Sequence, residues 1–78
     1  MNVSEKIKGY IAKAFNISVD SIRDDTRFIE DIKADSLDLM DFIMEMEDIF
    51  NITIDDDVIP TLTTVGAAVS YVESQVNK

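Results

Sequence analysis

The side chains that could do chemistry in this 78-residue chain are sixteen carboxylates and a set of hydroxyls, because the sequence contains no histidine and no cysteine. Their absence excludes the usual catalytic triads, cysteine nucleophiles and ordinary zinc sites. A carboxylate pair can do acid–base chemistry, but carboxylates in polar stretches are not tuned for it. We therefore expect no catalytic residue, no metal site and no enzymatic activity. If the chain handles thioesters, the thiol must come from a prosthetic group.

Ser36 has the most distinctive context of the hydroxyls. It follows Asp35 in a stretch, residues 34–50, that has no Gly, no Pro and no basic residue. The spacing of its apolar residues predicts a helix of about four turns with a buried stripe, made of Leu39, Ile43, Met46 and Phe50. Asp35 is the expected N-cap. A helix N-terminus has free N–H groups and tolerates an attached phosphate, although a serine there, taken alone, is nearly always just a cap.

The remaining surface of this helix divides into two parts. A projection at about 100° per residue places five acids on an arc opposite the buried stripe, and Glu47 is a sixth acid of the same helix. We call these six residues the acidic arc: Asp35, Asp38, Asp41, Glu45, Glu47 and Asp48. Leu37, Met40 and Met44 lie on a flank beside it, which we call the apolar margin. The arc is either a solvated face or a docking surface for basic partners.

The motif Asp35-Ser36-Leu37, after an Ala and at the start of an acidic helix, resembles the acyl carrier protein family. In that family the Ser of Asp-Ser-Leu carries 4′-phosphopantetheine through a phosphodiester. The resemblance covers nearly the whole chain, since residues 28–32, 47–50, 54–55 and 63–65 also look like family segments. Lys33 departs from the family, which usually has Gly there. This difference leaves the local backbone open and places one cation near the pantetheine site.

The resemblance implies a carrier of acyl thioesters on a phosphopantetheine arm at Ser36, flanked by Asp35 and Leu37. The free-standing length and acidic helix look most like type II fatty acid synthesis. The implied partners are a pantetheinyl transferase, synthesis enzymes with basic patches, and acyl chains as cargo. The acidic arc and the apolar margin would form the partner surface. Two alternatives stay open: a carrier for polyketide, aminoacyl or D-alanyl cargo, and an unmodified acidic interaction domain.

Charge is distributed unevenly along the chain, which has a net charge of −9. Residues 1–33 hold six basic and six acidic side chains, residues 34–77 hold ten acids and no base, and Lys78 ends the sequence. We therefore expect no nucleic-acid partner and no anionic membrane partner. The length predicts one domain, residues 1–78. No apolar run is long enough to span a membrane, and we expect a cytoplasmic monomer without a signal peptide.

The remaining pattern predicts a small all-α bundle of three main helices, a short fourth helical piece and a long first loop. The first helix is expected over residues 3–15, with a cap at Asn2 and a stop at Asn16, and its apolar stripe contains Val3, Ile7, Tyr10, Ile11 and Ala14. Residues 17–34 form the loop, several of whose apolar side chains should anchor it to the core. Asn51 should end the second helix, and Pro60 should limit the fourth piece to one turn or a 3₁₀ segment.

The last helix is expected over residues 64–76 with Thr63 as its cap. Its apolar stripe contains Val65, Ala68, Val69, Val72 and Val76. We expect the shared core to be rich in Ile, Val and Met.

Overall fold

Three α-helices form the computed structural model, which describes residues 2–77. They are α1 (Val3–Phe15), α2 (Ser36–Phe50) and α3 (Val65–Val76), with short 3₁₀ helices η1 (Val19–Ser21) and η2 (Ile59–Thr61) in the connections. No strand occurs in the described residues, which contain only an isolated bridge between Arg27 and Thr64. The all-α prediction is confirmed, including the short fourth piece at Pro60, whereas η1 was not predicted. Lys78 lies outside the described residues.

The ends of α1 and α2 are set by two asparagines in the left-handed conformation. Asn16 has φ 56° and its N–H donates to the carbonyl of Ala12, while Asn51 has φ 54° and its N–H donates to the carbonyl of Glu47. Asparagine tolerates this conformation better than most side chains. The predicted stops are therefore confirmed, and at the other end of α1 the Asn2 side chain accepts from the N–H of Glu5.

The start of α3 differs from the prediction by one residue. The N-cap is Thr64, whose hydroxyl accepts from the N–H of Ala67 at 3.1 Å, and the helix begins at Val65. Thr63 was the expected cap, but its carbonyl accepts from the N–H of Phe28 at 3.1 Å. This contact with the first loop holds Thr63 in the connection, so Thr64 takes the capping position.

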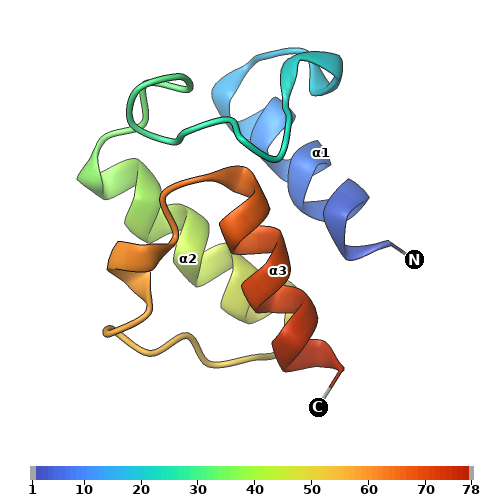
Figure 1. The fold of residues 1–78 in the computed structure, drawn as a ribbon, viewed down its shortest axis with the longest axis vertical. Helices are drawn as coiled ribbons and strands as arrows, with labels where there is room; N and C mark the ends of the chain where they lie inside the picture. Colours follow the sequence, from blue (N-terminus) through green and yellow to red (C-terminus); the bar gives the residue numbers. More distant parts are fainter. Residues whose placement is uncertain (1, 78) are drawn as a thin grey trace.

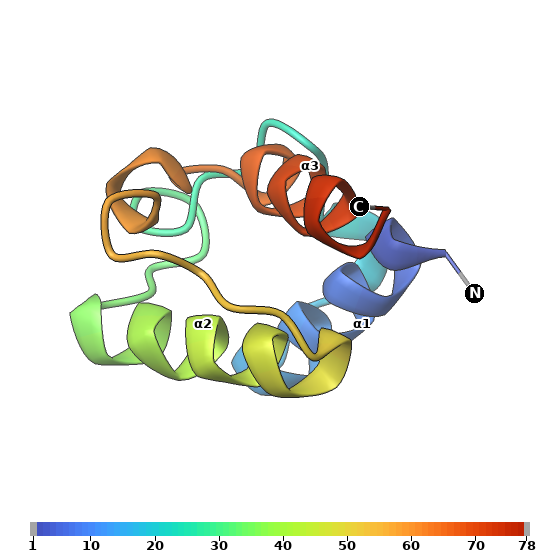
Figure 2. The ribbon, with the colours of Figure 1, turned by 90° about the horizontal axis from the view of Figure 1, so that it is seen from below.

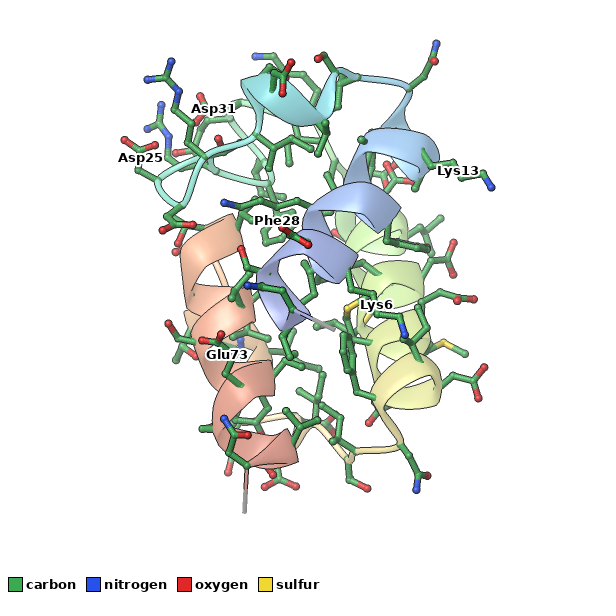
Figure 3. The ribbon with its side chains drawn as sticks, turned by 90° about the vertical axis from the view of Figure 1, so that its right-hand side faces the viewer. Lys6, Lys13, Asp25, Phe28, Asp31 and Glu73 are labelled. Carbon is green, nitrogen blue, oxygen red and sulfur yellow. The ribbon has the colours of Figure 1, made fainter. Side chains whose placement is uncertain are left out.

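The core lies where the three helices meet. Figure 3 shows α1 in front of the molecule, between α3 on one side and α2 on the other, and Figure 2 shows α2 and α3 on opposite sides of the interior. The largest fully buried side chains are Phe28, Phe42, Ile7, Ile11, Met46, Val65 and Val72. The ring of Phe42 lies 5.1 Å from that of Phe28 and 5.9 Å from that of Tyr10, between centroids.

Four details of the predicted core were wrong. Phe42 is buried although it lies outside the predicted stripe, because α2 packs against the first loop through Phe28 as well as against α1 and α3. Ala14 is exposed because the inward-facing stripe of α1 runs through Ile7 and Ile11 to the partly buried Phe15, which follows Ala14 in the chain. Val76 follows the last buried residue of α3 and is also exposed. Met46 is the only buried methionine among the described residues.

The first loop is tied to the start of α3 (Figure 1). Its buried Ile22 and Phe28 enter the core, which confirms the expected anchoring, whereas Val19 and Ile29 are exposed. Backbone N–H groups of Val65 and Gly66 donate to the carbonyls of the loop residues Thr26 and Asp24, at 2.9 and 2.7 Å. The loop carbonyls thus satisfy N–H groups that the first turn of a helix cannot pair internally.

The connection from α2 to α3 is anchored by Ile54 and Leu62, which are both buried. Pro60 lies inside η2, where a 3₁₀ turn accommodates its missing N–H.

No helix within residues 2–77 is long and apolar enough to cross a membrane.

Candidate functional site

Ser36 is the first residue of α2 and its side chain is exposed. Its hydroxyl makes no hydrogen bond to any other described residue. Asp35 precedes it in an extended conformation, with φ −96° and ψ −176°, and is the N-cap. The predicted cap is therefore confirmed, while the helix starts at Ser36 and leaves Ala34 in the loop. The Ser36 hydroxyl is therefore accessible from solvent.

A reciprocal pair of hydrogen bonds closes the first turn of α2. The N–H of Asp38 donates to Oδ1 of Asp35 at 2.8 Å, and the N–H of Asp35 donates to Oδ2 of Asp38 at 3.1 Å. This is a capping box with Asp in the position that Glu or Gln usually occupies, so the Asp-x-x-Asp spacing was a signal that sequence reasoning missed. The bonds found in the first turn leave the N–H groups of Ser36 and Leu37 without a partner in residues 2–77.

The backbone before Ser36 is anchored in the core. Ala34 is buried and its N–H donates to the carbonyl of Phe28 at 2.9 Å. Phe28 is itself 1% exposed and its N–H donates to the carbonyl of Thr63. Ser36, the candidate attachment residue, therefore lies two residues after the buried and hydrogen-bonded Ala34. Through Phe28, Ala34 is linked to the first loop and to the start of α3.

Arg27 and Asp31 fold the loop segment that leads to this anchor. The guanidinium donates from Nε to Oδ2 and from Nη2 to Oδ1 of Asp31, both at 3.2 Å, and the N–H of Arg27 donates to Oδ2 at 2.9 Å. The side-chain hydrogen bonds from Arg27 lower the pKa of Asp31, and those to Asp31 raise the pKa of Arg27. Asp31 is labelled in Figure 3. Sequence reasoning did not identify this pair.

Lys33 lies between two inward-facing residues and is exposed. Its φ is 68°, which is the left-handed region that favours glycine. Ile32 and Ala34 on either side are partly and fully buried, and their N–H groups donate to the carbonyls of Arg27 and Phe28. A lysine thus occupies a left-handed backbone position, at the place where the family that the sequence resembles usually has Gly.

The acidic arc separates into engaged and unengaged carboxylates. Asp35 and Asp38 cap the helix, and Oε2 of Glu47 accepts from the N–H of Ile54 at 2.8 Å. The exposed carboxylates of the other three make no hydrogen bond or ion pair within residues 2–77, namely Asp41, Glu45 and Asp48. The pKa of Tyr10 is raised first by burial and then by the charges of Glu45 and Asp41.

The apolar margin is exposed as the helical projection predicts. Leu37 is 75% exposed, Met44 is 61% and Met40 is 44%. Ile49 is 37% exposed on the same helix and was not identified from the sequence. Met44 also borders a hollow in the surface that is lined by Glu45, Glu47 and Asp48. Exposed apolar side chains thus lie beside free carboxylates on α2.

Comparison with known families gives one match over most of the chain. The family model described as "Phosphopantetheine attachment site" matches residues 5–72. The chain is 46% identical over 72 residues to the acyl carrier protein of Lactobacillus acidophilus, covering 92% of this chain and 90% of that protein. It is 39% identical over 77 residues to the acyl carrier protein of Buchnera aphidicola, covering 99% and 98% of the two chains.

A solved structure agrees with the arrangement of helices. The acyl carrier protein of Enterococcus faecalis superposes with a TM-score of 0.83 at 37% sequence identity, over 94% of this chain and 92% of that one. The similarity therefore covers the loop, the start of α2 and the helices that position them.

Proposed function

This chain belongs to the phosphopantetheine-attachment family of acyl carrier proteins, and we propose that Ser36 is the attachment residue. A phosphodiester would join its Oγ to 4′-phosphopantetheine, whose terminal thiol would hold the cargo as a thioester. Asp35 and Leu37 would flank the arm. The chain's own residues fit this group, because Ser36 is exposed, its hydroxyl has no partner in the described chain, and it stands at a helix start that favours an anionic group.

The observation that carries this proposal is the position of Ser36 at the N-terminus of α2, after a buried and hydrogen-bonded Ala34. A fixed helix start holds the base of a flexible arm in one place, while the arm itself can reach different partners. The chain has no cysteine and needs a prosthetic group to form a thioester. It would act as a carrier and a substrate of enzymes, and would not be a catalyst.

The test is the intact mass of the protein after co-expression with a pantetheinyl transferase. The wild-type chain should gain one pantetheine group, and Ser36→Ala should gain none while keeping its helical circular dichroism. Ser21→Ala is a matched control, since Ser21 is exposed in the first loop and its hydroxyl donates to the carbonyl of Ser18. Modification that persists in Ser36→Ala would reject the assignment.

Type II fatty acid synthesis is the proposed setting. It is supported by the free-standing relatives named acyl carrier protein, which match over nearly their whole length. Synthesis enzymes with basic patches would dock on the acidic arc and the apolar margin, and acyl chains would be the cargo. A monomer in the cytoplasm is part of the same proposal. Loading assays with purified acyl, aminoacyl and polyketide-forming enzymes distinguish this cargo from the alternatives.

A further inference from the structure

Lys33 differs from the other charged residues around Ser36 in sign. Apart from Lys33, the titratable residues within five positions of Ser36 are acids, namely Asp31, Asp35, Asp38 and Asp41. Asp31 is paired with Arg27, and Asp35 and Asp38 cap α2. Lys33 makes no ion pair within residues 2–77 and is exposed. Lys33 therefore has no ion-pair partner in the described chain, although its charge, after the hydrogen bonds from Arg27, helps to lower the pKa of Asp31.

The backbone keeps this cation close to Ser36. Three peptide units separate the two Cα atoms, so they lie within about 11 Å of each other. Lysine carries its ammonium on a flexible four-carbon stem, which can cover much of that distance. The segment cannot swing away, because the N–H groups of Ile32 and Ala34 on both sides of Lys33 are hydrogen-bonded to loop carbonyls. The left-handed φ of 68° is thus held by its neighbours.

Attachment of an arm at Ser36 changes the charge balance at this point. A phosphodiester adds one negative charge beside the carboxylates of Asp35 and Asp38, and like charges at this spacing repel. The helix N-terminus offsets part of the repulsion. Lys33 is the only basic residue within eight positions of Ser36 in the sequence, and charges interact over a Debye length of about 8–10 Å at ordinary ionic strength.

We propose that Lys33 is a positioning residue for the prosthetic arm, pairing with the phosphodiester at Ser36 and holding the base of the arm against the first loop. This inference rests on the proposed function, since it needs the arm at Ser36. It assigns a role to a lysine in a backbone position where glycine is less strained.

The experiment compares melting temperatures of the apo and pantetheinylated forms in the wild type and three variants. Lys33→Gln removes the charge and keeps a side chain at the left-handed position, whereas Lys33→Arg keeps the charge. Lys33→Gly removes the charge and the backbone strain together. Intact mass confirms full conversion of each sample before it is melted.

Loss of the cation should make the arm more destabilising. At low salt, the change in melting temperature on pantetheinylation should be about 2–5 °C more negative in Lys33→Gln and Lys33→Gly than in the wild type and Lys33→Arg. The difference should vanish near 1 M salt, where the Debye length is about 3 Å. The apo form of Lys33→Gly should melt higher than that of Lys33→Gln, because only glycine relieves the strain.

A second readout is the NMR signal of the Lys33 ammonium group, which should shift on pantetheinylation. Lys8 is the control, since its Nζ already lies 3.1 Å from the Asp24 carboxylate, and its signal should stay in place. Equal apo-to-holo changes in all four proteins, at full conversion, would overturn the role of Lys33 and leave the function intact. A wild-type protein that gains no pantetheine mass would reject both.

Discussion

Asp35 and Asp38 exchange two hydrogen bonds across the first turn of α2, 2.8 and 3.1 Å long, on either side of the candidate attachment residue. Both acids belong to the acidic arc, which the sequence leaves open as either a solvated face or a docking surface. Their carboxylates accept backbone N–H groups, so their first effect is on the helix start. A substitution at Asp38 therefore changes stability as well as surface charge, and it cannot test docking alone.

Asp38→Ala should lower the free energy of unfolding by about 1 kcal/mol, the usual cost of losing a helix cap. Asp38→Glu should recover most of it, since Glu is the common partner in a capping box. Asp41→Ala is the control, because Asp41 is exposed and makes no hydrogen bond within residues 2–77, and it should change stability by less than about 0.5 kcal/mol. Urea denaturation measures all three. Equal losses in Asp38→Ala and Asp41→Ala would contradict the capping role.

Substitution by alanine at Gly66 and at Gly9 should change the free energy of unfolding in opposite directions. An added Cβ at Gly66 would lie 2.7 Å from the carbonyl oxygen of Asp24 and 3.0 Å from its Cβ, whereas at Gly9 nothing lies within 4 Å. Gly66→Ala should therefore cost about 1–3 kcal/mol, because the first loop must move off α3. Gly9→Ala should gain about 0.5–1 kcal/mol in the interior of α1. Thermal and urea melts test the pair, and a stable Gly66→Ala protein would show that the loop is loosely held.

The sequence alone predicted those structural elements that depend on residues close together in the chain. Helical spacing located α2, the asparagine stops at Asn16 and Asn51 were correct, and Pro60 restricted η2 to a 3₁₀ turn. Each depends on residues within one or two turns. The exposure of Leu37 and Met44 followed from the same projection. The attachment candidate was found because a short motif and a helix start coincide at Ser36.

Contacts between distant segments could not be predicted in this way. Phe42 is buried because Phe28 packs on it from the first loop, and Thr64 caps α3 because the same loop binds Thr63. The bond from the N–H of Ile54 to the Glu47 carboxylate likewise joins residues that no helical period relates. These pairings depend on how the loops fold back, which a projection of one helix does not contain.

The Arg27–Asp31 pair should make part of the stability dependent on pH in the acid range. Hydrogen bonds from Arg27 lower the folded-state pKa of Asp31 from its ordinary value of 3.8. The stabilisation is therefore fully present above that value and is lost as pH falls through the lower folded-state pKa. The difference in free energy of unfolding between the wild type and Asp31→Asn should be constant from pH 7 to about 5 and shrink below it.

Urea melts at closely spaced pH values measure this difference. Asp56→Asn is the control for the removal of one acid, because Asp56 is exposed and makes no hydrogen bond to another described residue. The comparison with a variant is needed because protonation also relieves repulsion among the ten acids of residues 34–77. A constant difference down to pH 2 would contradict the pairing.

Partner docking should divide between the free carboxylates and the apolar margin. Asp41→Lys or Glu45→Lys should mainly slow association with a basic ketoacyl synthase and weaken its salt dependence, since exposed charges steer encounter. Asp41 and Glu45 suit this test because their carboxylates have no partner in the described chain, whereas those of Asp38 and Glu47 accept backbone N–H groups. Stopped-flow measurements at two salt concentrations separate the rate constants of association and dissociation.

Met44→Ala should mainly raise the dissociation rate, at a cost in binding free energy of about 1–2 kcal/mol if its side chain is a desolvated anchor. Met44 is 61% exposed in the free protein, so its truncation should leave the free energy of unfolding within about 0.5 kcal/mol of the wild type. Ile29→Ala is the matched control, because Ile29 is 50% exposed and lies in the first loop, away from α2 in sequence. Equal effects of the two truncations would assign the loss to exposed apolar area in general. A stable Met44→Ala protein that binds with the wild-type dissociation rate would remove the apolar margin from the recognition surface and leave docking to charge alone.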